Sequence, residues 1–293
     1  MKIGKINRKS IALSGFTSIL KNYEGMPAEL YVAGKLPNTR VPAVAIVGSR
    51  KPTAYGKEVT YSLARQLAAQ DVAIISGLAY GIDAIAHQAA LDAGGYTVAV
   101  FAQGLHRIYP SENTALAEAI VASGGALISE REMGYEARKY DFLARNRLVS
   151  GLADAVVVPE ATERSGTLST IGHALEQNKD IFAVPGPITS LLSVGPNKLL
   201  QQGAQVALSA EDILNSIAPQ WRLLDSKKQC QTHLPLPDTP QEASVLECID
   251  RGVHHRDALV EQLQLPISEA LRLLTMMELK DLIRSQGELI YRK

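Results

Sequence analysis

The chain has 293 residues, of which 46% are hydrophobic, and its 30 basic residues balance its 30 acidic ones. A net charge of zero excludes a global attraction to nucleic acid or anionic lipid, so any basic site has to be local. The length and apolar content are sufficient for about two domains with a large buried core.

The sequence has no features of a secreted or membrane protein. Its two cysteines, Cys230 and Cys248, are too few for a disulfide framework or a zinc cluster, so both are expected to be reduced. The apolar stretch at residues 11–20 is too short and too interrupted by Ser, Gly and Thr to span a bilayer, and it does not resemble a signal peptide. We therefore expect a cytoplasmic protein without membrane contact.

Residues 1–27 are expected to form a short N-terminal extension, and residues 28–218 a Rossmann-like domain. Short apolar runs alternate there with amphipathic segments, which is typical of an α/β fold with a doubly wound, mainly parallel sheet. Strands are predicted at residues 44–47, 72–76, 97–101, 126–129, 155–159, 181–184 and 205–207, and helices at residues 55–70, 82–93, 113–123, 145–153, 167–178 and 196–202. Ligands of such sheets bind beyond the carboxyl ends of the strands.

The first predicted strand ends in the turn Gly48-Ser49-Arg50. Small residues let backbone N–H groups approach an anion closely, and the arginine adds a cation. The turn has no G-x-G-x-x-G motif and no acidic residue placed for a ribose, so it differs from the dinucleotide fingerprint. The sequence therefore indicates an anion site for a ligand other than a dinucleotide.

Two further loops after predicted strands are rich in small and polar residues. Residues 76–83 and 163–167 each lead into a helix, whose free N–H groups favour an anion. In the first of these loops, Asp83 falls in the opening turn of the helix, where a carboxylate complements the helix dipole. We therefore interpret Asp83 as a structural residue.

In the segment at residues 138–147, basic residues alternate with aromatic ones between a predicted strand and a predicted helix. Such a segment suits single-stranded nucleic acid, because the cations bind phosphates while an unpaired base stacks on an aromatic ring. In the alternative interpretation, Phe142 and Leu143 anchor the loop in the core and its charges form a solvated surface. The segment alone does not decide between the two.

Several of these motifs together resemble one family. The chain is similar in motif order and spacing to the DprA (Smf) DNA-processing family at Val47–Arg50, Ser76–Asp83, Tyr109-Pro110, Phe142–Arg147, Ser165–Thr167 and Ala183–Gly186. The resemblance covers residues 28–214. It implies a domain that binds single-stranded DNA, forms a homodimer, protects incoming DNA and helps load a RecA-type recombinase during natural transformation.

The resemblance also implies where the DNA binds. Arg50 corresponds to a phosphate-contacting cation, and Lys139 and Phe142 to a basic and an aromatic position that hold the backbone and a base. The predicted DNA-binding residues are Gly48, Ser49, Arg50, Gly77, Lys139, Phe142, Arg145, Asn146, Ser165 and Gly166. The usual Pro-rich stretch before Phe142 is absent here, which affects the placement of Lys139 but not of Arg50.

Residues 219–240 have the proline-rich, polar composition of a linker. Three helices at residues 241–251, 255–264 and 267–280, with a hairpin at residues 282–284 and 289–291, then predict a winged-helix-like domain. Its candidate recognition helix carries Arg272 and Lys280 against Glu269 and Glu278, which is a poor charge pattern for binding duplex DNA. A contact with a protein or a regulatory role fits this helix at least as well.

No catalytic, cofactor or metal motif is evident. The sequence has no G-x-S-x-G elbow and no Walker loop, and the pair His254-His255 lacks a further ligand at suitable spacing. The rival hypothesis is a nucleotide-processing hydrolase of the lysine-decarboxylase-like Rossmann group, whose phosphate loop and downstream glutamate are echoed by residues 165–167 and Glu176. We expect a DNA-binding protein rather than an enzyme, without cofactor or metal.

Overall fold

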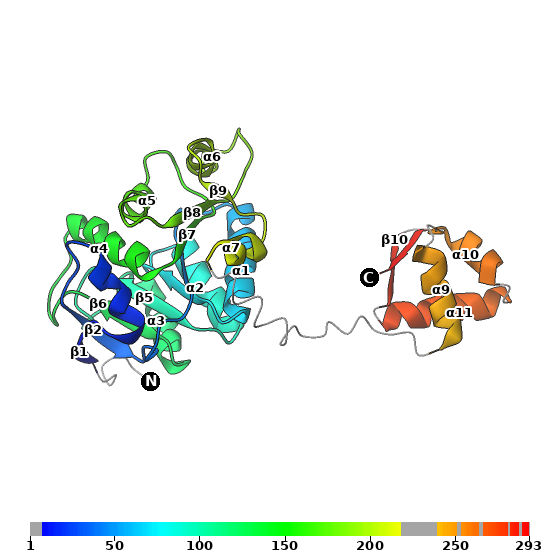
Figure 1. Ribbon diagram of the computed structural model, residues 1–293, viewed down its shortest axis with the longest axis horizontal. Coiled ribbons are helices and arrows are strands. Elements are labelled where there is room, and N and C mark those ends of the chain that lie inside the picture. The colour runs from blue at the N-terminus through cyan, green and yellow to red at the C-terminus, as the bar shows by residue number, and fades with distance from the viewer. Residues whose placement is uncertain are drawn as a thin grey trace. The chain divides into compact units, whose positions relative to one another are not determined.

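The computed structural model describes residues 8–217, 239–250, 253–263, 266–280, 282–286 and 289–292. The chain divides into two compact units, Met1–Pro219 and Gln220–Lys293 (Figure 1), which are described separately. The predicted linker at residues 219–240 lies outside the described residues except for its last two positions.

The first unit contains a nine-stranded sheet within the described residues, in the order β1-β2-β6-β5-β4-β3-β7-β8-β9. Its strands are β1 (Arg8–Ala12), β2 (Glu29–Gly34), β3 (Ala43–Ile46), β4 (Ala73–Ser76), β5 (Thr97–Phe101), β6 (Ala126–Ser129), β7 (Ala155–Val158), β8 (Asp180–Ala183) and β9 (Gln205–Val206). Strands β3 to β9 pair in parallel. The predicted doubly wound, mainly parallel sheet is confirmed.

The two antiparallel strands were absent from the prediction. β1 pairs with β2 from Arg8↔Ala33 to Ala12↔Glu29, and β2 pairs antiparallel with β6. Between them, the 3-10 helix η2 (Gly15–Asn22) buries Phe16 and Leu20 completely. From residue 8 onward, the segment expected to be an extension therefore belongs to the sheet domain.

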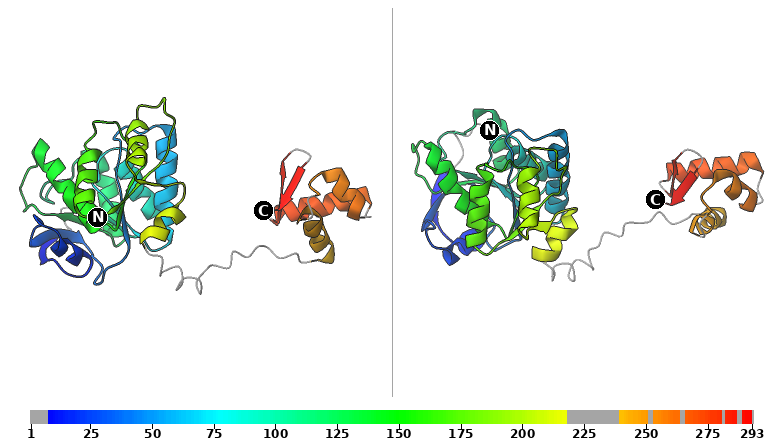
Figure 2. Two further views of the ribbon diagram at one scale, coloured as in Figure 1. Left: turned by 45° about the horizontal axis from the view of Figure 1, so that its top comes forward. Right: turned by 90° about the horizontal axis from the view of Figure 1, so that it is seen from above.

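Helices cover both faces of the sheet (Figure 2). One face packs against η2, α4 (Lys139–Leu152), α5 (Thr167–Glu176) and α6 (Val194–Gln201). The other packs against α1 (Ala54–Ala69), α2 (Ile82–Asp92), α3 (Thr114–Ala122), which follows the short η3 (Ser111–Asn113), and α7 (Ala210–Ile217). Across the described residues, none of the helices combines the length and the apolar character needed to cross a membrane.

Helix α4 begins earlier than predicted. The segment at residues 138–147 was expected to be largely a loop, with the helix starting at Arg145, but the helix starts at Lys139. The carboxylate of Asp141 stabilises this start, because it accepts hydrogen bonds from the Arg138 N–H group (2.8 Å), the Tyr135 hydroxyl (3.1 Å) and the Arg131 guanidinium (3.2 Å). The second half of α4 is buried in the core.

The second unit contains α9 (Pro240–Asp250), α10 (Arg256–Leu263) and α11 (Ile267–Leu279), followed by an antiparallel hairpin of β10 (Ile283–Gln286) and β11 (Leu289–Arg292). Its core includes Val245, Leu259, Leu274 and Ile290. The predicted winged-helix arrangement is confirmed.

Candidate nucleic-acid interface

A cleft of about 770 Å³ lies at the carboxyl ends of the parallel strands. Its position follows from the topology, because the chain leaves β3 toward β4, β5 and β6 on one side and later returns to β7 on the other side of β3. Doubly wound sheets bind ligands at this point of reversal. The loops after β3, β4 and β7 line the cleft together with the first turns of α4 and α5.

The structure brings all the residues predicted from the sequence to this one cleft. Those that line it are Gly48, Ser49, Arg50, Gly77, Lys139, Phe142, Arg145, Asn146, Ser165 and Gly166. Their placement is an observation, whereas their contact with DNA stays a prediction.

The turn that carries Arg50 is clamped on both sides. The Ser49 N–H group donates to the Glu160 carbonyl oxygen (2.7 Å), and the Ser49 carbonyl accepts from the Ile82 N–H group (3.1 Å). Gly81 has a φ of +73°, and a Cβ atom there would lie 2.4 Å from the Ser49 oxygen, so only glycine fits. The clamp fixes the backbone of the turn while the Arg50 side chain stays exposed at the rim.

Arg145 has a different environment from Arg50. It is only 6% exposed, and its guanidinium donates to the Gly77 carbonyl (2.9 Å) and to the Val100 carbonyl. Burial lowers the pKa of Arg145 to about 10, although the nearby charge of Asp83 opposes this shift. The guanidinium therefore holds the ends of β4 and β5 together beneath the cleft.

Asp83 stabilises the loop that follows β4. Its carboxylate accepts hydrogen bonds from the N–H groups of Gly77 (3.1 Å) and Ala79 (3.3 Å). Burial raises the pKa of Asp83, and the charge of Arg145 opposes the shift. These contacts agree with the structural role predicted for Asp83.

The first turns of α4 form one wall of the cleft. Lys139 is exposed, and the half-buried ring of Phe142 packs against the ring of Tyr109, with 5.5 Å between centroids and 55° between planes. Further along α4, the Asn146 side chain donates to the Gly166 carbonyl (3.3 Å). This bond joins the wall to the start of α5.

The start of α5 has the properties of an anion site. The first N–H groups of a helix have no partner within the helix, and the helix dipole places partial positive charge there. The Ser165 hydroxyl oxygen, just before α5, is buried and has no hydrogen-bond partner among the described residues. The N–H groups of Leu168 and Ser169 already donate to the carbonyl oxygens of Ser165 (3.1 Å) and Gly166 (3.2 Å), so the Ser165 hydroxyl is the group that a phosphate oxygen in the cleft would satisfy.

The prediction did not include every residue of the cleft, and two of the missing ones can contact a nucleic acid through a charge or an aromatic ring. Arg164 and Tyr109 both line the cleft. Arg164 directly precedes Ser165, so a cation beside an anion-binding loop was the available signal; Tyr109 lay in a motif quoted for the family resemblance. Like Arg50 and Lys139, Arg164 is exposed and forms no salt bridge with a described residue.

The rival hydrolase hypothesis requires a glutamate at the cleft. Glu176 is the last residue of α5, at the opposite end from the cleft; its side chain is 76% exposed and pairs with His173. It does not line the cleft. Among the described residues, no group of three or more His, Cys, Asp or Glu side chains could hold a metal ion.

The fold and cleft define a Rossmann-like ligand-binding protein with a winged-helix domain, and comparison with known proteins gives the family. Residues 10–218 match the family model of DNA recombination-mediator protein A, and residues 231–288 match the DprA winged helix domain. The chain therefore belongs to the DprA family of DNA-processing proteins.

Relatives cover both the sequence and the fold. DprA of Bacillus subtilis is 40% identical over 213 residues, which are 72% of this chain and 71% of the relative. Protein Smf of Escherichia coli is 37% identical over 262 residues, which are 86% of this chain and 68% of the relative. The crystal structure of DprA from Streptococcus pneumoniae matches with a TM-score of 0.66 and 36% identity over 74% of this chain and 76% of that one. A structure of DprA from Helicobacter pylori, reported for its single-stranded DNA binding mode, matches with a TM-score of 0.65 and 32% identity over 75% and 99%.

Proposed function

We propose that this chain binds single-stranded DNA without sequence preference in the cleft at the ends of β3 and β7. The observation that carries the proposal is the convergence of three exposed cations, Arg50, Lys139 and Arg164, on one cleft. Phosphate is the anion that a nucleic acid offers at regular spacing, and arginine and lysine are its usual partners. The binding mode reported for the Helicobacter pylori relative supports the proposal.

The cleft suits a single strand better than a duplex. Its volume of about 770 Å³ falls in the range of small-ligand sites, so it holds a short piece of strand. The ring of Phe142 forms part of its wall, and an unpaired base has a free face to stack on such a ring. We assign the cations to phosphates and Phe142 to a base, which makes binding independent of sequence.

The test is a fluorescence-anisotropy titration with labelled single strands, the matching duplex and a mononucleotide, at several salt concentrations. We expect the single strand to bind most tightly. If the three cations neutralise three phosphates, log affinity should fall with log salt at a slope of about −2, from roughly 0.7 per phosphate. A flat salt response would contradict the proposal.

Variants of the cations complete this experiment. Arg50→Ala, Lys139→Ala and Arg164→Ala should each weaken binding and reduce the salt slope by about 0.7. Matched controls are Arg65→Ala and Lys57→Ala, which remove exposed cations from a different surface of the same domain. If the controls lose as much affinity as the cleft variants, the cleft is not the binding site.

We further propose that bound DNA is protected from nucleases and passed to a RecA-type recombinase in the cytoplasm, as natural transformation requires. The description of the matching family as a recombination mediator supports this role. The test is whether the chain shields single strands from a nuclease and accelerates recombinase filament formation on them. Arg50→Ala should weaken both effects if they depend on the cleft.

We also propose that the chain acts as a homodimer and as a binding protein rather than an enzyme. The open edge of the sheet at β9 supports a dimer, because Val206 in that strand and Leu208 after it are exposed. Light scattering on the purified chain measures the mass directly. Release of base or phosphate from a nucleoside monophosphate, abolished by Glu176→Ala, would instead support the hydrolase.

A further inference from the structure

Exposed aromatic side chains continue beyond the cleft. Tyr109 is 51% exposed, lines the cleft and packs against Phe142. Tyr80 is 41% exposed and lies close enough to Tyr109 for their side chains to interact electrostatically. We refer to Phe142, Tyr109 and Tyr80 together as the aromatic row; Phe142 and Tyr109 line the cleft, and Tyr80 does not.

The two loops that carry the tyrosines are tied together. Tyr80 lies in the loop after β4 and Tyr109 in the loop after β5. The side-chain amide of Asn113 donates to the carbonyl oxygens of Leu78 (2.8 Å) and Ala79 (3.3 Å), so the second loop is bonded to the first. A surface held in this way before binding loses little conformational freedom when a ligand arrives.

The charges near the aromatic row favour different parts of a DNA strand at its two ends. The carboxylate of Glu112 accepts a hydrogen bond from the Ser111 hydroxyl (3.0 Å) and lies close enough to the Tyr80 hydroxyl to raise the pKa of that tyrosine. This negative charge repels phosphates from the outer end of the row, whereas Arg50, Lys139 and Arg164 attract them to the cleft. Neutral bases are the part of a strand that suits the aromatic row.

We propose that Tyr80 and Tyr109 form a second base-binding surface, the tyrosine platform, on which bases of the strand stack after it leaves the cleft. The inference rests on the proposed binding of single-stranded DNA. It adds a direction to that binding, since the strand runs from the cations past Phe142 toward Tyr80. It also assigns a use to Tyr109, which no prediction from the sequence included.

The test compares the parent with Tyr80→Ala, Tyr109→Ala and the double variant in the full chain. The probes are labelled oligothymidylates of about 4 to 16 nucleotides, the span of site sizes in single-strand binding folds, and the same strands with abasic sugars. We expect each alanine variant to bind intact strands about fivefold more weakly or worse. On abasic strands, parent and variants should bind equally, because no base remains to stack.

Two control variants and two further measurements separate stacking from other effects. Tyr80→Phe with Tyr109→Phe keeps both rings and should bind like the parent. Tyr61→Ala removes an exposed tyrosine that does not line the cleft and should change nothing. The salt slope of the alanine variants should equal that of the parent, because no phosphate contact is lost. Their melting temperatures should fall only slightly, because Tyr109 packs against Phe142 but about half of each tyrosine is exposed.

The outcomes distinguish this inference from the proposed function. If the parent binds single strands and Arg50→Ala weakens binding, but the double alanine variant binds like the parent, only the tyrosine platform is overturned. An equal loss of affinity on intact and abasic strands overturns it as well, since the effect would then not depend on bases. If the parent shows no binding to single strands, the proposed function fails first.

Discussion

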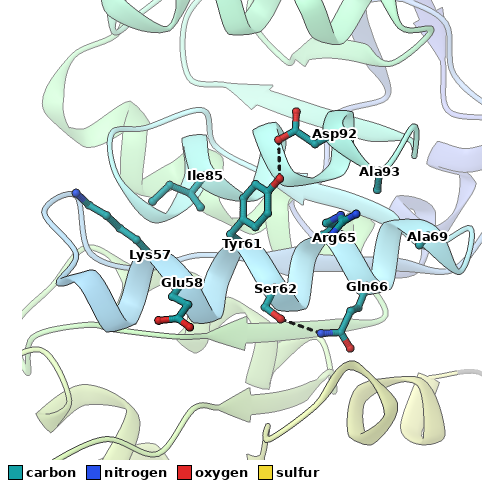
Figure 3. A pocket seen from close by; sticks show the side chains of 10 residues that line it. All are labelled: Lys57, Glu58, Tyr61, Ser62, Arg65, Gln66, Ala69, Ile85, Asp92 and Ala93. Carbon is teal, nitrogen blue, oxygen red and sulfur yellow. Dashed lines mark hydrogen bonds between the residues drawn. The ribbon is translucent and has the colours of Figure 1, made fainter. Parts of the chain in front are cut away.

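The first unit has two hollows of equal volume, about 770 Å³ each, with different linings. The cleft presents loop backbone, a helix start and exposed cations. The other, the α1–α2 hollow, is lined by helix side chains (Figure 3). In it, Lys57 and Arg65 are matched by Glu58 and Asp92, and the Tyr61 hydroxyl donates to Asp92 (2.8 Å).

The suitability of a hollow for an anionic ligand depends more on its position in the fold than on its volume. At the carboxyl ends of parallel strands, backbone N–H groups and helix dipoles point toward the ligand whatever the side chains are. On the flank of two helices the backbone is occupied by its own hydrogen bonds, so only side chains can bind, and here their charges cancel. These differences support the proposal that DNA binds in the cleft rather than in the α1–α2 hollow.

The largest difference in stability between variants of the two hollows should come from Arg145, the arginine beneath the cleft. Arg145→Met leaves two strand-end carbonyls without their donor and Asp83 without its neighbouring positive charge. We expect a loss of about 3 kcal/mol or more in unfolding free energy, which is a fall of about 6 to 12 °C in melting temperature. Calorimetry measures it. Arg65→Met in the α1–α2 hollow is the matched control and should shift the melting temperature by less than about 2 °C.

The next largest effect concerns a glycine of the cleft. In Gly77→Ala, the new Cβ atom would lie 2.5 Å from a nitrogen of the buried Arg145 guanidinium, so the loop has to move, at a cost of about 1 to 3 kcal/mol. Gly172→Ala, in α5, meets nothing within 4 Å and should instead stabilise the fold by up to about 1 kcal/mol. Opposite shifts of melting temperature are expected, and shifts of the same sign would contradict this account of the cleft.

A moderate, pH-dependent effect is expected at the start of α4. Burial by itself would raise the pKa of Asp141, but hydrogen bonds from Arg138 and Tyr135 and the charge of Arg131 outweigh it and hold the pKa below its usual value. The charged carboxylate therefore stabilises the fold above its unfolded pKa of about 4, and this contribution is lost as the pH falls through the lower folded value.

Asp141→Asn should thus cost about 1.5 kcal/mol at pH 7, or about 3 to 6 °C in melting temperature. The difference from the parent should shrink as the pH is lowered below about 4. Melting curves recorded across the acidic range check this. A difference that stays constant with pH would show that the carboxylate charge is not what stabilises the helix start.

The smallest effect is expected in the α1–α2 hollow. Tyr61→Phe removes one exposed hydrogen bond, to Asp92, and should change stability by less than about 0.5 kcal/mol. It should leave the affinity for single strands unchanged in an anisotropy titration. A measurable loss of affinity would mean that the α1–α2 hollow also takes part in DNA binding, which would contradict the proposal that the cleft alone is the site.

Much of the central sheet could be predicted, because a buried parallel strand is a continuous apolar run. The strand predicted at residues 97–101 is β5 at Thr97–Phe101, and that at 126–129 is β6. The antiparallel β1 was missed because Arg8–Ala12 lies at the sheet edge and has only one strongly strand-forming residue, Ile11. Its pairing depends on β2, the next strand along the chain, from which η2 separates it.

The composition of the cleft was predictable for a topological reason. Loops after parallel strands meet at one edge of the sheet, so turns far apart in the chain could be expected to converge. The burial of Arg145 could not be predicted, because its partners, Gly77 and Val100, lie in a loop and a strand that are distant in sequence. The earlier start of α4 depends on partners of Asp141 that precede the helix in a loop.

Helix α4 gives the cleft a mechanical property. Lys139 and Phe142 lie near one end of this helix, and Leu148 and Leu152, which are fully buried and do not line the cleft, lie toward the other. Because the second half of α4 is packed in the apolar core, the backbone positions of Lys139 and Phe142 are coupled to each other and to that packing. The positions of Lys139 and Phe142 in the cleft therefore depend on core side chains that do not line it. Removing a methyl group from that part of the core would displace both residues.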